Sequence, residues 1–176
     1  MPRGTRLRLL FQDEGRFGRI HDGRRYWAPV PLRPCIGQQV VREFVYAFAA
    51  VSPSDGRIAS LVLPWVDADL MSLFLAHTAA QFPGDHWVVL MDGAGRHKAN
   101  ALVVPDAMTL VPLPPYSPGC NPVEQIWKYT RTNGLRNQTF DSLDQGVDVV
   151  SDTLHARPDL LRSITCFDGM NTLPLM

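Results

Sequence analysis

Apolar and β-branched residues come in short runs over the first third of the chain, a pattern typical of strands separated by turns. These runs predict strands over residues 7–12, 26–30, 40–51 and 57–65. Glycines and charged residues after the first run predict a hairpin turn, and the segment 52–56 (SPSDG) predicts another. We therefore expect the amino-terminal part of the chain to form antiparallel strands.

A helical period replaces this pattern further along the chain. It predicts a helix from Asp67 to about Phe82, with Asp67 or Asp69 as its N-cap and with Pro83 and Gly84 ending it. Four residues recur at helical spacing and would form its buried face, namely Leu70, Leu73, Phe74 and His77. One face of this helix is therefore expected to cover the strands.

The second half alternates short apolar runs with helical segments. The runs predict buried strands at 86–91 and 108–112, and the helical segments are 123–132 and 141–157. A loop and a short helix are expected after Asp92, whereas 164–176 shows no pattern and is expected to be loosely held. Antiparallel strands followed by this alternation predict one α/β domain over 1–176, a mixed sheet with helices on both faces.

Composition excludes several classes of protein. The chain has 176 residues, of which 45% are hydrophobic, so a disordered or fibrous protein is excluded. Its 17 basic residues balance 17 acidic ones, so net charge predicts no partner. The three cysteines have neither disulfide-framework nor zinc-ligand spacing. No apolar run approaches the roughly 18 residues of a membrane span, so we expect a cytoplasmic protein with no membrane partner.

Three acidic residues stand where catalytic carboxylates are often found. Asp13 and Asp92 each follow an apolar run, and Glu124 lies in the first turn of a predicted helix, where the helix dipole would stabilise its charge. Acids from three segments would repel one another unless cations joined them, and carboxylate oxygens are ligands that Mg²⁺ or Mn²⁺ prefers. Taken singly, each acid is more often a helix cap or a surface charge than a functional group.

The sequence around these acids resembles the catalytic domain of the mariner superfamily of DDE transposases, in its bacterial insertion-sequence branch. The most specific segment is LPPYSPGCNPVEQIW, which contains Glu124. FQDEGRFG, with Asp13, and MDGAGRHKA, with Asp92, are similar to the two other motifs of the family. The gap of 31 residues between Asp92 and Glu124 is also typical of the family. The resemblance covers about residues 7–165.

The resemblance implies an RNase H-like fold with a mixed five-stranded sheet and a catalytic triad of Asp13, Asp92 and Glu124. These acids would be the ligands of two Mg²⁺ or Mn²⁺ ions, with both aspartates bridging the ions and Glu124 completing one site. The implied activity is cleavage of DNA at transposon ends and transfer of the freed 3′ hydroxyl to target DNA at TA dinucleotides. Transposon ends and target DNA would be the partners, bound by a homodimer or a higher oligomer.

Five neighbouring residues are candidates for supporting roles. Strand alternation lets only one of Asp13 and Glu14 face the metals, so Glu14 is expected to be a supporting residue or a salt-bridge partner. His97 would orient a phosphate or a water, or else be a partly buried polar residue. Asn121 would cap the helix that carries Glu124. Lys128 and Arg131 share one helix face and would contact DNA phosphate, with plain solvation as the equal alternative. The four tryptophans are expected in or near the core.

The chain departs from the family in one respect and leaves rival functions open. No helix-turn-helix region is found before Asp13, so we expect a catalytic part whose DNA-reading region could come from an upstream reading frame. A truncated or domesticated copy is equally compatible. One rival is an RNase H-like nuclease that only hydrolyses, and another is a catalytically silent module that regulates or dimerises with a transposase. A bacterial protein of this type would be cytoplasmic, associated with the nucleoid when bound to DNA.

Overall fold

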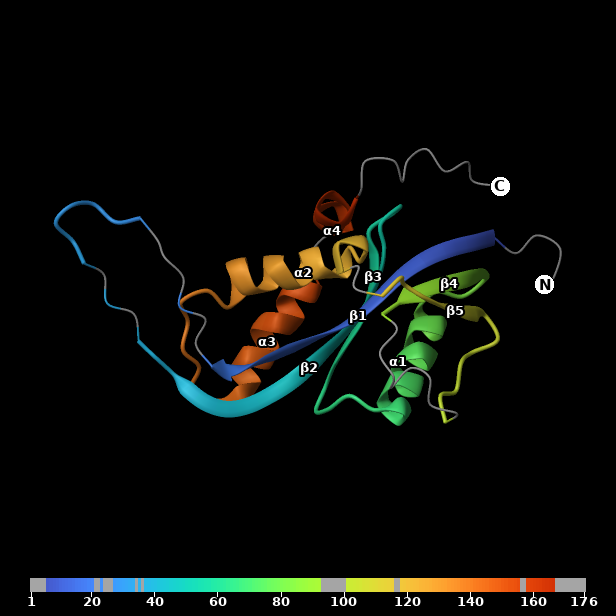
Figure 1. The fold of residues 1–176 in the computed structure, drawn as a ribbon, viewed down its shortest axis with the longest axis horizontal. Coiled ribbons are helices and arrows are strands. Elements are labelled where there is room, and N and C mark those ends of the chain that lie inside the picture. Colours follow the sequence, from blue (N-terminus) through green and yellow to red (C-terminus); the bar gives the residue numbers. More distant parts are fainter. Residues whose placement is uncertain are drawn as a thin grey trace.

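Five strands form one mixed sheet in the computed structural model, with the order β3-β2-β1-β4-β5 (Figure 1). The structure describes residues 6–20, 23, 27–33, 35, 37–92, 101–115, 118–155 and 158–166. The strands are β1 (Arg6–Ile20), β2 (Val40–Ser52), β3 (Arg57–Leu63), β4 (Asp85–Met91) and β5 (Met108–Pro112). β1, β2 and β3 are antiparallel, whereas β1 with β4 and β4 with β5 are parallel. The predicted mixed five-stranded sheet is confirmed.

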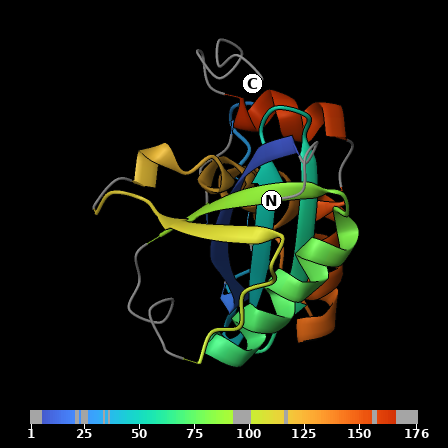
Figure 2. The same ribbon diagram turned by 90° about the vertical axis from the view of Figure 1, so that its right-hand side faces the viewer.

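Helices cover both faces of this sheet, as predicted (Figures 1 and 2). The helices are α1 (Ala68–Gln81), α2 (Val123–Tyr129), α3 (Leu143–Leu154) and α4 (Pro158–Thr165), with short turns η2 (Pro118–Cys120) and η3 (Thr130–Gly134) beside α2. Each face has its own core: Phe74 of α1 is buried with Trp87 of β4, and Ile126 of α2 is buried with Phe11 of β1. Among the described residues, no helix is long and apolar enough to cross a membrane.

β1 is much longer than predicted. The sequence places a turn after Glu14, but the strand continues to Ile20 and pairs with β2 along that length. Gly15 is a packing residue here, because a Cβ atom at this position would lie 2.7 Å from Cε2 of Phe17 and 2.9 Å from Cδ2 of Trp127. β1 pairs with β4 only as far as Phe11. Asp13 is therefore in the middle of β1 but just beyond the point where β4 ends.

The predicted strand at 26–30 is wrong. Residues 27–30 belong to no strand, and Pro29 and Pro31 lack the N–H groups that a sheet requires. Trp27 is fully exposed and Trp65 is 57% exposed, so the expectation that all four tryptophans lie in or near the core holds only for Trp87 and Trp127. Aromatic character alone did not reveal which tryptophans are covered by a neighbouring element.

Helix α1 has the predicted cap, but its buried face is shifted. Asp67 is the N-cap and accepts a hydrogen bond from the N–H of Leu70 over 2.8 Å. The buried residues are Met71, Phe74, Leu75 and Thr78, whereas Leu73 of the predicted face is exposed. Apolar residues occupy most sides of this helix, so its sequence period did not single out one face. Packing against the sheet made that choice.

The carboxyl-terminal helices also differ from the prediction. The single helix expected over 141–157 is α3, which ends at Leu154, and α4 follows it from Pro158. Leu161 and Thr165 of α4 are buried, so this end of the described chain packs on the α2 side of the sheet. The short helix expected after Asp92 falls mostly on 93–100, which lie outside the described residues. Cys35, Cys120 and Cys166 form no disulfide.

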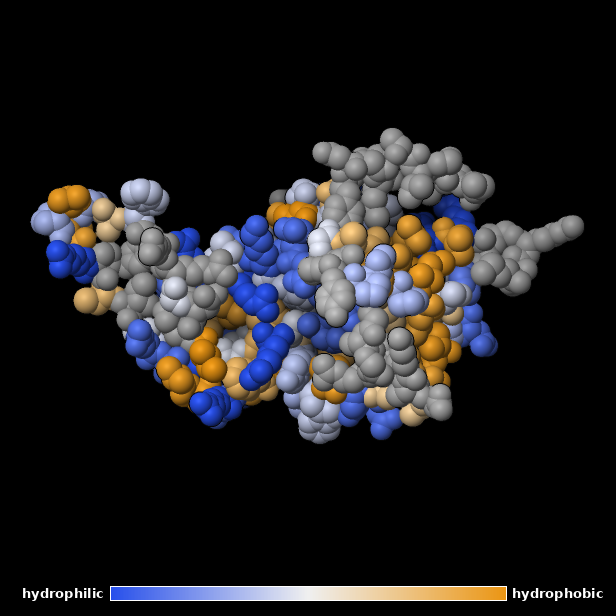
Figure 3. All heavy atoms as spheres, in the orientation of Figure 1, coloured by the Kyte–Doolittle hydropathy of each residue, from blue (hydrophilic) through white to orange (hydrophobic). Residues whose placement is uncertain are grey.

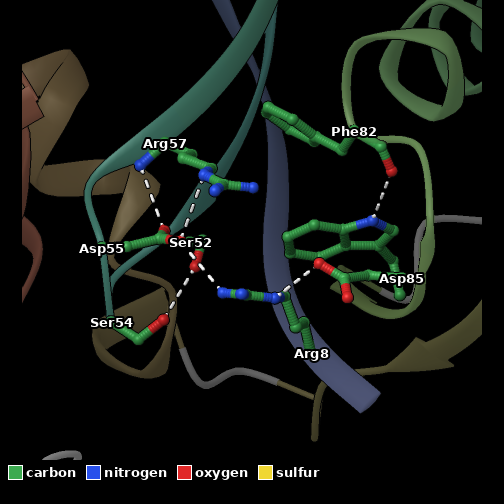
Figure 4. Close-up of polar contacts among 8 residues, drawn as sticks. Arg8, Ser52, Ser54, Asp55, Arg57, Phe82 and Asp85 are labelled. Carbon is green, nitrogen blue, oxygen red and sulfur yellow. Dashed lines mark hydrogen bonds and ion pairs between the residues drawn. The ribbon is translucent and has the colours of Figure 1, made fainter. Parts of the chain in front are cut away.

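A polar network joins three segments at the start of β1 (Figure 4). Nη1 of Arg8 lies 3.1 Å from Oδ2 of Asp55 in the β2–β3 turn, and its Nε lies 2.6 Å from Oδ2 of Asp85 at the start of β4. Asp55 also pairs with Arg57 over 3.3 Å. Because Arg8 is only partly exposed and fixed by two carboxylates, this network holds the register of β1 against both neighbouring strands.

We predict that Gly15→Ala destabilises the protein by about 1–3 kcal/mol, because the added methyl group must displace Phe17 or Trp127 in a buried layer. Urea unfolding followed by circular dichroism measures the change. Gly119→Ala is the matched control, since nothing lies within 4 Å of a Cβ atom at that position. Equal stability of the Gly15 variant and the wild type would contradict this account of β1.

Candidate active site

Asp13 lies half-buried where β1 passes beneath α2. Its Oδ2 accepts a hydrogen bond of 3.0 Å from Nε1 of Trp127, and its Oδ1 accepts one of 2.9 Å from the backbone N–H of Glu14. A carboxylate offers about four lone-pair positions, so both oxygens keep a position for a further ligand. The two donors hold the side chain in one orientation.

Burial raises the pKa of Asp13 from its ordinary value of 3.8 to about 7. The hydrogen bond from Trp127 lowers this pKa, while the nearby negative charge of Glu124 raises it. The N–H of Glu14 lowers it slightly further, and the charge of Glu14 opposes that effect. The structure thus brings Asp13 and Glu124 within electrostatic reach of each other. Without a cation, the charged form of Asp13 is unfavourable.

Glu124 is exposed in the first turn of α2, and Asn121 fixes the position of that turn. The Oδ1 atom of Asn121 accepts a hydrogen bond of 3.2 Å from the N–H of Val123, and its Nδ2 donates one of 2.9 Å to the carbonyl of Gln12. The N-cap of α2 is Pro122 and the helix has no side-chain cap bond, so Asn121 supports the first residue of the helix rather than capping it as predicted. In addition, the same side chain ties the start of α2 to the residue before Asp13.

Asp92 is the first residue after β4 and is exposed. Phe11 of β1 is the register partner of Leu90 in β4, and both contribute to the core on the α2 side. Continuing this parallel register by two residues brings Asp92 alongside Asp13. Because side chains alternate, both acids belong to the same face as Phe11 and Leu90. The strand topology thus places Asp92 at the end of β4 that lies next to Asp13.

The donor set fits a divalent cation. Within the described ranges, no group of three His, Cys, Asp or Glu residues surrounds a common point. Asp13 is nevertheless a half-buried carboxylate whose pKa is raised by burial and by the charge of Glu124, and such a carboxylate is stabilised by a proton or by a cation. All three candidates supply oxygen ligands, as Mg²⁺ and Mn²⁺ require. Asp13 and Glu124 are the two candidates whose charges interact.

The predicted supporting residues have different outcomes. Glu14 accepts a hydrogen bond of 3.0 Å from Nε2 of Gln12, so it lies on the Gln12 side of β1, opposite to Asp13, in agreement with strand alternation. Lys128 is exposed one turn after Glu124. The guanidinium of Arg131 lies 5.1 Å from the ring centre of Phe17. His97 lies outside the described residues.

Trp127 is the residue that sequence reasoning missed. It is expected only as a core residue, but its indole N–H orients Asp13 while its ring packs edge-on against Phe17 with centroids 5.6 Å apart. The signal available in the sequence was spacing. Trp127 follows Glu124 by three residues, so it occupies the next helix turn and faces the strand that carries Asp13.

The fold, with its RNase H-like mixed sheet, is similar to that of chains in solved Mos1 transposase complexes. One similar structure is the Mos1 transposase paired-end complex with the left transposon end. The match covers 90% of this chain and 51% of the Mos1 chain, with a TM-score of 0.66 and 16% sequence identity. The Mos1 mariner paired-end complex with Mn matches 88% of this chain and 50% of its own, with a TM-score of 0.65 and 17% identity. The chain spans about half the length of these solved chains.

The chain belongs to the family of DDE superfamily endonucleases, whose family model matches residues 8–145. It is also 43% identical over 102 residues to the uncharacterized protein y4pE/y4sA of Sinorhizobium fredii (strain NBRC 101917 / NGR234). That alignment covers 57% of this chain and 76% of the relative. The family resemblance inferred from the three acidic motifs is thus confirmed.

We predict that Asp13→Asn stabilises the metal-free protein at pH 8. A pKa raised to about 7 means that the charged carboxylate costs stability progressively as pH rises from about 4 to about 7. Removing this charge is expected to contribute about 1–3 kcal/mol, after the loss of about 1 kcal/mol for one acceptor. Thermal unfolding in EDTA between pH 5 and 8 measures the difference in stability between the wild type and the Asp13→Asn variant.

The difference in stability between the Asp13→Asn variant and the wild type should increase with pH. It should disappear when Mn²⁺ is added, because the cation stabilises only the wild-type carboxylate. Asp148→Asn, which removes an exposed charge from α3, serves as the control and should change little. A variant whose stability advantage is independent of pH would contradict the assigned environment of Asp13.

A second prediction concerns Trp127→Phe. This change keeps an aromatic ring in the core but removes the donor to Oδ2 of Asp13. We expect Mn²⁺ binding to weaken by about 10-fold to 100-fold, the range found when a residue that orients a metal ligand is changed. Calorimetric titration with Mn²⁺ measures the affinity. Unchanged affinity in a folded Trp127→Phe protein would show that the indole N–H has only a packing role.

Proposed function

We propose that this chain is the catalytic domain of an insertion-sequence transposase that cleaves DNA strands and joins them in a metal-dependent reaction. The observation that carries the proposal is the contact of α2 with half-buried Asp13, in which Trp127 donates to Oδ2 of Asp13, while burial and the charge of Glu124, on the same helix, raise the pKa of Asp13. Membership of the DDE superfamily endonucleases supports it. Solved Mos1 paired-end complexes with Mn and with Mg support the choice of cation.

Asp13, Asp92 and Glu124 would hold two Mg²⁺ or Mn²⁺ ions. Bound there, the ions would activate the nucleophile and stabilise the leaving oxygen of an in-line phosphoryl transfer. The protein contributes the geometry. Trp127 orients Asp13, and Asn121 holds the start of α2 against β1 so that Glu124 stays beside it. Such preorganised ligands spare the reaction the cost of assembling three repelling acids.

The chemistry requires no covalent bond to the protein. In cleavage, the oxygen of water forms a bond to phosphorus as the bond to the 3′ oxygen breaks, which leaves a 3′ hydroxyl and a 5′ phosphate. In strand transfer, that 3′ hydroxyl replaces a 3′ oxygen of target DNA, so the number of phosphodiester bonds is conserved. The attacking oxygen releases a proton to solvent and the leaving oxygen gains one.

The partners follow from the same proposal. Two transposon ends and a target, with TA dinucleotides as the insertion site, would be bound by at least two copies of the catalytic domain. End recognition would be supplied by a helix-turn-helix region, in our proposal the product of an upstream reading frame. The Mos1 structures are described as paired-end complexes with transposon ends, which supports an assembly of this kind.

A strand-cleavage and strand-transfer assay with Mg²⁺ or Mn²⁺ tests the proposed function. The protein would be assayed alone and joined to the upstream reading-frame product, each with an Asp92→Asn variant. We expect this variant to lose at least about 100-fold of cleavage, because a ligand of the reacting cations is removed. Asp148→Asn, an exposed acid on α3, should retain activity.

Each rival function predicts a different result in this assay. Cleavage without joining would identify a nuclease that only hydrolyses. Failure of both reactions in a folded protein with the upstream product present would identify a silent regulatory module. Full cleavage by the Asp92→Asn variant would overturn the assignment of the three acids.

A further inference from the structure

A basic pocket of about 200 Å³ lies along the part of β1 that extends beyond β4. Three arginines contribute to its lining, together with glutamines and an aromatic residue: Arg16, Arg19, Arg131, Gln39, Gln138 and Phe140. No acidic residue is among the described residues that line it. Figure 3 shows strongly hydrophilic residues over the middle of one face of the molecule, next to hydrophobic residues.

The arginines of the basic pocket are held by aromatic rings rather than neutralised. The guanidinium of Arg16 lies 3.6 Å from the ring centre of Phe44, and that of Arg131 lies 5.1 Å from the ring centre of Phe17. Among the described residues, neither has a carboxylate partner. Stacking uses the flat face of a guanidinium and leaves its N–H edge for an anion.

The wall of the basic pocket is built to stay in place. Nε of Arg19 donates to the carbonyl of Phe140 over 3.0 Å, and its Nη1 pairs with Glu43 over 2.8 Å. Gln39 bonds both backbone groups of Phe140, donating to the carbonyl over 2.7 Å and accepting from the N–H over 3.0 Å. Arg19 is thus a structural cation, and the free positive charge comes from Arg16 and Arg131.

The positive charges of Arg16 and Arg131 lie at about the same distance along the chain from the acids of their own segments. Arg16 follows Asp13 by three residues on β1, which is about 10 Å at roughly 3.3 Å per residue, and its side chain leaves the strand on the Glu14 side, opposite to Asp13. Arg131 follows Glu124 by seven residues along α2 and η3, which is also about 10 Å at roughly 1.5 Å per residue. Successive nucleotides of a DNA strand rise about 3.4 Å, so the pocket lies about three nucleotides from the acids.

We propose that the basic pocket binds a backbone phosphate of the DNA strand whose reacting phosphate lies at Asp13, Asp92 and Glu124. This assignment rests on the proposed function. Arginine N–H groups directed at phosphate oxygens position a strand without reading its bases, so the contact is independent of sequence. It sets the direction in which the strand leaves the active site, along α2 and past Lys128.

Binding of DNA in EDTA tests this proposal without requiring catalysis. Fluorescence anisotropy would follow a labelled duplex bound to the full chain, the Arg16→Gln/Arg131→Gln double variant and an Arg162→Gln control. Arg162 is exposed on α4 and does not line the pocket. We expect the double variant to bind about 10-fold more weakly and the slope of log K against log salt to fall by about 1–2, as for one or two lost phosphate contacts. The control should keep both values.

Three further experiments distinguish a DNA-binding site from a purely structural role of the two arginines and from a site for free anions. Arg131→Lys in place of Arg131→Gln should restore most of the slope of log K against log salt that the double variant loses, because lysine keeps the positive charge. DNA should protect Arg16 and Arg131, but not Arg162, from modification by phenylglyoxal. Wild-type affinity and slope in the double variant, or no salt-sensitive binding by the full chain, would overturn the proposal.

Competition by inorganic phosphate as strong as that by an oligonucleotide of equal phosphate concentration would also overturn it, in favour of a free-anion site. Strand cleavage is measured separately. If the double variant loses affinity and slope but the wild type never cleaves DNA, the pocket assignment stands and the proposed function fails.

Discussion

The contact of α2 with β1 is the constraint on which the rest of the site depends. Trp127 donates to Asp13, and Asn121 donates to the carbonyl of Gln12, so one helix is joined to one strand at two successive turns. Gly15 makes the approach possible, because a side chain there would occupy the space of the indole ring. This contact brings Glu124 to Asp13, and it also fixes the direction in which Arg131 leaves the site.

The same contact has an electrostatic cost. Burial raises the pKa of Asp13 to about 7, and the charge of Glu124 adds to the effect, so the ionised pair destabilises the metal-free fold. Active sites often retain an unfavourable arrangement that the surrounding structure compensates. Here the compensation comes from two apolar cores, one on each face of the sheet, and from the network of Arg8 at the far end of β1.

The change of partner along β1 explains where the chemistry lies. Arg6 to Phe11 pair with β4, whereas Phe11 to Ile20 pair with β2, so Phe11 is the residue at which the partner changes. The end of β4 delivers Asp92, while the open part of β1 offers Asp13 to α2 and Arg16 to the basic pocket. A single strand thus carries one acid of the proposed triad and one arginine of the proposed phosphate site, separated by two residues.

Much of the secondary structure could be predicted from the sequence alone, and the sequence alone also singled out the three candidate acids. The apolar runs of β2, β4 and β5 and the cap of α1 are local patterns, and the three acidic motifs belong to the family that the comparisons confirm. Tertiary structure decided the rest. The length of β1, the buried face of α1 and the role of Trp127 all depend on which distant segment packs against each residue. Local periodicity records that a side chain is apolar or polar, whereas its partner is chosen only when the sheet and its helices are assembled.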